Sequence, residues 1–154
     1  MLKFASFDIV FQEVPDEVTL ALNISGCPNC CPGCHSAHLM EDVGEELSEE
    51  NMGNLIESYR SSITCVCFMG GDAEPETIER LGEFVHREYG LKSAWYSGRN
   101  ISPQDPSTLD YVKLGDYRAE CGGLSSPTTN QRMYRVVNGR FEDITSRFWG
   151  SQRF

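Results

Sequence analysis

Residues 18–35, VTLALNISGCPNCCPGCH, join an apolar predicted strand to a segment in which four of ten residues are cysteine. Cys27, Cys31 and Cys34 have the spacing C-x3-C-x2-C, which suits three corners of an iron-sulfur cube. A [4Fe-4S] cluster normally takes four thiolates, so three cysteines leave one iron open to a ligand from outside the protein. The spacing therefore predicts a cluster with one open iron, where chemistry can occur.

The same segment contains a fourth thiol, Cys30, and can also be divided into two adjoining C-x-x-C pairs, Cys27/Cys30 and Cys31/Cys34. Paired C-x-x-C is typical of zinc sites or of dithiol redox chemistry. Zinc sites usually separate their two pairs by about a dozen residues or more, whereas here the pairs adjoin. We favour the iron-sulfur cluster, and a zinc-binding or redox-sensing module stays the alternative.

The composition predicts a single domain, residues 1–154, in a soluble protein, with 40% hydrophobic and 23% charged residues. No apolar run approaches the roughly 18 residues that a membrane span requires, so we expect no membrane partner. The 23 acidic and 13 basic residues give a formal net charge of −10, which repels phosphate backbones and argues against nucleic-acid binding. Seven cysteines in such a chain favour metal or redox use in a reducing compartment, and we expect a cytoplasmic protein.

The apolar pattern predicts strands alternating with helices, and hence a mostly parallel sheet. Strands are expected at residues 4–14, 18–24, 63–69, 92–97 and 110–114, the first two as a hairpin. Helices are expected after an N-cap at Ser48, and from about Pro75 to a C-cap at Gly90. An Asn138-Gly139 turn predicts a small C-terminal β-hairpin. We expect Cys65 and Cys67 to be core residues, and His86 to lie at the surface.

A second motif, Gly70-Gly71-Asp72, directly follows the strand at 63–69, as the cysteine segment follows the strand at 18–24. Ligands of open α/β sheets bind outside the carboxyl ends of the strands, so the two motifs should face one pocket. Two glycines let a ligand approach the backbone, and the Asp72 carboxylate can accept hydrogen bonds from an ammonium group. An ordinary strand-to-helix turn is the alternative reading of these three residues.

The order of the two motifs resembles that of the radical S-adenosylmethionine (SAM) enzymes, which carry C-x3-C-x2-C after an early strand and a Gly-Gly-Glu-like segment after the next. In that family the amino and carboxylate groups of SAM chelate the fourth iron, and the glycine-rich segment holds the amino group. The resemblance implies two sets of site residues. The implied cluster ligands are Cys27, Cys31 and Cys34, and the implied SAM contacts are Gly70, Gly71 and Asp72.

Within that family the chain is most similar to the small activating proteins of anaerobic ribonucleoside-triphosphate reductase. The likeness rests on Cys-Pro-Gly-Cys-His at 31–35, on Trp95-Tyr96-Ser97-Gly98 and on Asn130-Gln131-Arg132. It implies an oxidoreductase that cleaves SAM reductively to methionine and a 5′-deoxyadenosyl radical, and so generates a glycyl radical on a partner protein.

The implied partners are the large glycyl-radical subunit of the reductase and an electron donor such as flavodoxin or ferredoxin. A radical SAM activase of another glycyl-radical enzyme is a further alternative. The expected fold class is α/β, a partial TIM-like (β/α) barrel with a mostly parallel sheet and the C-terminal hairpin. The sequence leaves open the roles of four features. They are Cys30, His35, Cys121 and Asn130-Gln131-Arg132.

Overall fold

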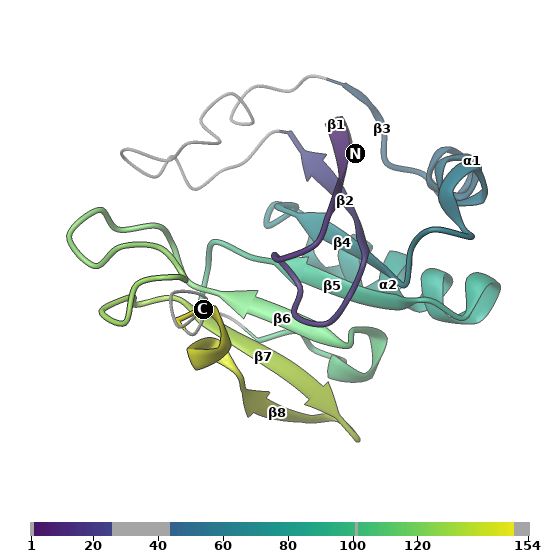
Figure 1. The fold of residues 1–154 in the computed structure, drawn as a ribbon. Helices are drawn as coiled ribbons and strands as arrows, with labels where there is room; N and C mark the ends of the chain where they lie inside the picture. Colours follow the sequence, from purple (N-terminus) through teal and green to yellow (C-terminus); the bar gives the residue numbers. More distant parts are fainter. Residues whose placement is uncertain (1, 26–43, 101, 150–154) are drawn as a thin grey trace.

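The computed structural model describes residues 2–25, 44–100 and 102–149, which form one mixed eight-stranded sheet and two α-helices (Figure 1). The strands, in sheet order, are β3 (Glu45–Glu46), β1 (Lys3–Val10), β2 (Thr19–Ile24), β4 (Cys65–Met69), β5 (Lys92–Tyr96), β6 (Tyr111–Leu114), β7 (Arg132–Val137) and β8 (Arg140–Asp143). The helices are α1 (Glu49–Tyr59) and α2 (Pro75–Tyr89). No helix in the described ranges is long and apolar enough to cross a membrane.

The centre of the sheet consists of four parallel strands, β2, β4, β5 and β6. Leu22, Phe68, Trp95 and Val112 form one row across it, because each pairs in register with the next. Helix α2 makes the crossover from β4 to β5, whereas the connection from β5 to β6 is a loop with a single 3-10 turn. The carboxyl ends of the four strands therefore meet at one edge of the sheet.

The expected partial TIM-like barrel with a mostly parallel sheet is wrong on both counts, because the sheet is open and mixed. Four of its seven strand pairings are antiparallel: β1 with β2 and β3 on one side, and β7 with β6 and β8 on the other. A (β/α) barrel closes by pairing parallel strands that are each followed by a helix. Here antiparallel strands border the parallel centre on both sides, and only two α-helices form within the described residues.

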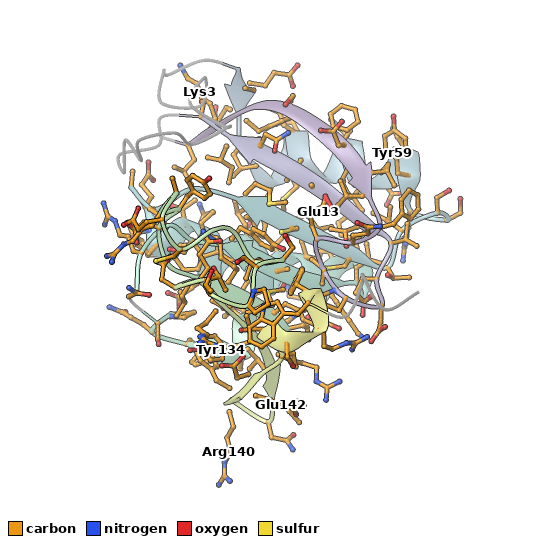
Figure 2. All side chains as sticks on the ribbon, turned by 60° about the vertical axis from the view of Figure 1, so that its left-hand side comes forward. Lys3, Glu13, Tyr59, Tyr134, Arg140 and Glu142 are labelled. Atoms are coloured by element: carbon orange, nitrogen blue, oxygen red, sulfur yellow. The ribbon has the colours of Figure 1, made fainter. Side chains whose placement is uncertain are left out.

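The C-terminal hairpin predicted by the sequence is present. Asn138 and Gly139 both have positive φ, 52° and 75°, as expected for a tight turn that matches the twist of its strands. Figure 2 shows its side chains Tyr134, Arg140 and Glu142 at the opposite end of the molecule from Lys3. The N-terminal hairpin of β1 and β2 is present too, with Asp16 in its turn at φ 69°.

Both helices begin or end where the sequence predicts. The Ser48 Oγ accepts a hydrogen bond from the Asn51 amide at 3.0 Å and caps α1. Gly90 ends α2 in the left-handed conformation, with φ 62°, and its N–H donates to the His86 carbonyl at 3.1 Å. The two helices pack on the same face of the sheet (Figure 1).

Two clusters of buried residues cover the two faces of the central strands. The larger one joins apolar side chains of both helices, such as Ile56 and Leu81, to Leu22, Phe68 and Trp95 of the sheet. The smaller one, on the face without helices, contains Val14, Cys65, Cys67, Ala94, Tyr111, Met133 and Ile144. The central strands are thus buried on both faces, as is usual for parallel sheets.

Candidate functional site

The candidate site lies at the carboxyl edge of β2 and β4. Asn23 of β2 pairs in parallel with Met69 of β4, so the two strands end side by side. A Cβ atom added to Gly70 would lie 3.3 Å from the Ile24 carbonyl oxygen, which places the glycine segment against the strand that leads to the cysteines. Cys27, Cys31 and Cys34 themselves lie outside the described residues.

The two glycines adopt conformations that side chains disfavour. Gly70 has φ +112° and Gly71 has φ +89°, and a Cβ atom on Gly71 would lie 2.6 Å from the Ile78 Cδ1. Both backbone groups of Gly70 bond to β5. Its N–H donates to the Tyr96 carbonyl at 3.0 Å, and its carbonyl accepts from the Trp95 indole at 2.7 Å. Backbone conformation and close packing within the chain thus already favour glycine at both positions, while contact with SAM stays a prediction.

Asp72 joins the carboxyl ends of β4 and β5. Its side chain is buried, with 2% exposed, and it accepts hydrogen bonds from the Ser97 hydroxyl at 2.5 Å and the Gly98 amide at 2.9 Å. Ser97 Oγ in turn accepts from the Arg99 amide at 3.1 Å. These hydrogen bonds hold the buried carboxylate at the carboxyl ends of both strands.

The sequence named both Asp72 and Ser97 but did not connect them. The available signal was topological, because both residues follow neighbouring strands of a parallel sheet. The hydrogen bonds of Asp72 give it a structural role, since they link the end of β4 to the end of β5. Its contact with SAM stays a prediction.

A cavity of about 150 Å³ lies beside this link, between the first turn of α2 and the loop after β5. Its lining includes Asp72, Glu79, Trp95, Ser97 and Arg99. The buried Glu79 carboxylate fastens that loop, since it accepts from the Gln104 amide at 3.1 Å and the Asp105 amide at 2.7 Å. The cavity is smaller than the roughly 300 Å³ at which ligand pockets usually begin, so it suits one group of a larger ligand.

The segment Asn130-Gln131-Arg132 holds the turn after β6. The Asn130 amide donates to the Asp116 carbonyl at 3.0 Å, and the Gln131 amide donates to the Gly115 carbonyl at 3.3 Å. Arg132 lies 3.7 Å from the Asp143 carboxylate on β8. The Asn130 Oδ1 is buried and accepts no hydrogen bond within the described structure, so a donor from a ligand would satisfy it.

The thiols on the central strand β4 are unsuited to metal binding. Cys65 and Cys67 are fully buried, and burial raises the pKa of both thiols well above the usual range, so they stay protonated. The prediction that both are core residues is confirmed. Within the described ranges no group of three or more His, Cys, Asp or Glu side chains is placed to hold a metal ion.

The prediction that His86 is a surface residue is wrong. Its side chain is 29% exposed and its Nε2 lies 2.6 Å from the Asp110 carboxylate and 3.1 Å from the Ser93 hydroxyl. The hydrogen bond to Asp110 raises the pKa of His86, against the opposing effect of burial. Sequence spacing had no means of finding this pair, because its members lie 24 residues apart.

His86, Asp110 and Ser93 are not arranged for nucleophilic catalysis. Asp110 and Ser93 contact the same ring nitrogen of His86, whereas a catalytic triad uses both nitrogens. Ser93 also donates its hydroxyl proton to the Thr108 carbonyl at 2.8 Å. The group lies at the amino ends of β5 and β6, opposite the candidate site, and fastens α2 to those strands.

Comparison with known proteins gives one match. A family model described as a 4Fe-4S single cluster domain matches residues 17–113, which is more than half of the chain. The matched region runs from the turn before β2 to β6 and includes the cysteine segment, both helices and all four parallel strands. No curated protein and no solved structure matches the chain.

Proposed function

The chain belongs to the 4Fe-4S single cluster domain family, and on this premise we propose that it is a radical SAM activating enzyme that generates a glycyl radical on a partner protein. Family membership makes it an iron-sulfur protein with a [4Fe-4S] cluster. The proposed partner is the large subunit of an anaerobic ribonucleotide reductase, and the proposed electron donor is a flavodoxin or ferredoxin.

The observation that carries the proposal is the contact between Gly70 and Ile24 at the carboxyl edge of β2 and β4. It brings the glycine segment to within two residues of Gly26, where the cysteine segment begins. A cofactor that binds both an open iron and a glycine-rich backbone requires the cysteine segment and the glycine segment to lie close together.

The donor set fits a cluster. Cys27, Cys31 and Cys34 supply three thiolates, which suit iron-sulfur ligation and leave the fourth iron open for SAM. When bound, the cluster and SAM together supply the electron transfer and the hydrogen-atom abstraction that the reaction needs. The two thiols of β4 do not compete for iron, because burial keeps them protonated.

The described residues also fit groups of SAM. Asp72 places a buried carboxylate at this edge, opposite in charge to an ammonium group, and the buried Asn130 Oδ1 accepts no hydrogen bond from the described residues. The cavity beside Asp72 and Trp95 is large enough for one such group. In this proposal the link from Asp72 to Ser97 and Gly98 orients the carboxylate and keeps water out of the edge between β4 and β5.

The decisive experiment uses anaerobically prepared protein. We expect stoichiometric iron and sulfide, cleavage of SAM by the reduced protein, and a glycyl signal in electron paramagnetic resonance after incubation with the reductase subunit. A zinc-containing, colourless protein would refute the cluster. Cleavage of SAM without a glycyl signal on this partner would refute only the choice of partner.

Single cysteine substitutions test which of the four thiols in the segment bind the cluster. We expect Ala at Cys27, Cys31 or Cys34 to abolish SAM cleavage, because each removes a cluster ligand. Cys30→Ala is the matched control and should retain most of the cluster, measured by iron content and visible absorption. Equal loss from all four substitutions would contradict the three-cysteine assignment and favour the paired C-x-x-C arrangement.

Asp72→Asn separates the two roles of that carboxylate. The amide keeps one oxygen acceptor, but its NH2 faces a donor, so we expect a loss of about 1–2 kcal/mol in the free energy of unfolding. If Asp72 also binds SAM, SAM affinity falls more than in Ser97→Ala, which removes the Ser97 hydroxyl and leaves the carboxylate in place. Equal SAM affinity in the two variants would leave Asp72 a purely structural residue.

A further inference from the structure

Among the described residues, the outer edge of strand β1 is paired over only part of its length. On that side β3 pairs with Lys3 and Phe4 alone. Gly44, just before β3, crosses β1 so closely that a Cβ atom on it would lie 2.1 Å from the Phe4 carbonyl oxygen. Beyond this crossing no strand of the described structure pairs with the outer edge of β1, and residues 5–8 are exposed.

An uncovered edge leaves hydrogen-bonding groups of the backbone available. In an antiparallel pair every second residue directs its N–H and C=O away from the partner strand. β1 pairs with β2 from Phe4 to Val10 with a register shift between Phe4 and Ser6, so from Ser6 to Val10 about half of the backbone groups point away from β2. Such an edge is a template for an added strand.

A groove of about 570 Å³ runs between this edge and helix α1. Ala5, Ser6 and Phe7 form its strand side, and Asn54 and Leu55 contribute to its helix side. The Phe7 ring is 37% exposed and packs on Tyr59 of α1 at a centroid distance of 5.7 Å. Figure 2 labels Lys3 and Tyr59, which belong to the two elements on either side of the groove. The groove thus combines an apolar floor with amide side chains and an open strand edge.

Acidic side chains outnumber basic ones at one end of this groove, where Lys3 of β1 pairs in register with Glu46. Glu45 lines it, and Glu46 and Glu50 are exposed on the adjacent β3 and on the first turn of α1. The whole chain carries a formal charge of −10. A second copy docking edge to edge would bring the same glutamates together, which is unfavourable, whereas a basic segment would be attracted.

We propose that the open edge of β1 and the groove beside α1 bind an extended, lysine- or arginine-bearing segment of a partner protein as an added β-strand. Backbone hydrogen bonds to β1 provide the affinity, an apolar side chain of the segment packs near Phe7 and Leu55, and Glu45 and its neighbours select for positive charge. This inference does not depend on the chemistry of the cluster, so it and the proposed function can fail separately.

The test uses the whole 154-residue chain and a fluorescein-labelled hexapeptide in which lysine alternates with valine, with binding followed by fluorescence anisotropy. We expect the same peptide with glutamate in place of lysine to bind at least about tenfold more weakly, because its charge matches that of the rim. Methylation of alternate backbone nitrogens in the lysine peptide should weaken binding by a similar factor, because it removes donors to the strand edge.

Substitutions in the groove locate the site. Phe7→Lys should weaken binding of the lysine peptide about tenfold, whereas Phe11→Lys, at a residue 68% exposed and outside the groove lining, should leave it within about twofold. Asn54→Lys and Asn54→Asp test the helix side at one exposed position, and only the lysine variant should weaken binding. Circular dichroism melts establish that each variant is folded.

Three outcomes would overturn the proposal. They are equal affinity for the lysine and glutamate peptides, indifference to backbone methylation, and equal effects of Phe7→Lys and Phe11→Lys. A concentration-dependent dimer that Phe7→Lys abolishes, seen by sedimentation, would also overturn it and assign the edge to a second copy of the chain.

Discussion

The parallel centre of the sheet and its antiparallel borders differ in burial and in what they carry. β4 and β6 are buried along almost their whole length, whereas most residues of β1 and β8 are exposed or half-buried. The family match covers the centre, from residue 17 to residue 113, and leaves β1, β7 and β8 outside. The candidate site thus lies at the end of the buried parallel strands, while the more exposed antiparallel strands form the two borders of the sheet. Substitutions in the centre should therefore cost more than matched ones in the borders.

The largest difference is expected between two glycines. Gly71→Ala forces a side chain into a left-handed conformation and against Ile78, so we expect a loss of about 3 kcal/mol in the free energy of unfolding. Gly139 lies in the turn of the C-terminal hairpin, and a Cβ atom added to it would have no atom within 4 Å. Gly139→Ala should therefore lower the free energy of unfolding only by the conformational cost of a left-handed alanine, about 1 kcal/mol. Urea denaturation measures both. Equal losses would mean that the packing of Gly71 against α2 relaxes freely.

Two neighbouring carboxylates provide the next test. Glu17 is 6% exposed and accepts hydrogen bonds from Thr64 at 2.7 Å, Lys92 at 3.0 Å and Tyr111 at 2.9 Å, which lie at the amino ends of β4, β5 and β6. Glu17→Gln turns an amide NH2 toward these donors, and we expect a loss of about 2 kcal/mol.

Asp16→Asn is the matched control for Glu17→Gln. Asp16 is exposed and pairs with Arg147 near the C-terminus at 2.6 and 2.7 Å. Solvent and salt screen such a pair, so we expect a much smaller loss that shrinks further at high salt. If Asp16→Asn cost as much as Glu17→Gln in urea denaturation, the borders would be as important for stability as the centre.

The smallest effect is expected within the centre itself, at His86. Its pKa is raised in the folded protein by Asp110, so the pair stabilises the fold fully below the unfolded pKa of 6.5 and loses that effect as pH rises through the folded value. His86→Gln should therefore cost about 1 kcal/mol near pH 6 and distinctly less near pH 9. Thermal melts across this range measure it. A loss that is independent of pH would show that His86 acts through its neutral ring alone.

The sequence predicted the local structure well. The Ser48 cap, the Gly90 helix end and the Asn138-Gly139 turn are all present, because each depends on a few adjacent residues. The short strand β3 went unpredicted, since two glutamates carry no strand signal and pair only because the chain crosses β1 at Gly44. The barrel was wrong for a related reason, because alternation of strands and helices does not specify which strands lie at the borders.

The candidate site, too, has features that the sequence predicted and features that it did not. The spacing of Cys27, Cys31 and Cys34 predicted an iron-sulfur protein, and the family match supports that prediction. The hydrogen bond between Ser97 and Asp72 and that between His86 and Asp110 could not be predicted from the sequence. Each joins residues about 25 positions apart. Periodicity reports which face of an element is buried but says nothing about what that face meets.

The helix ends and the two hairpins could be predicted from the sequence alone, since capping and turn formation are properties of short segments. The cysteine spacing likewise predicts a cluster, while the assignment of Cys27, Cys31 and Cys34 as its ligands stays a prediction. Three features follow only from the tertiary arrangement of the described residues: the open sheet, the position of Gly70 against Ile24, and the unpaired stretch of β1 beside α1. Those outcomes depend on how strands distant in sequence order themselves in one sheet, and that order follows from the burial of the whole chain rather than from any one segment.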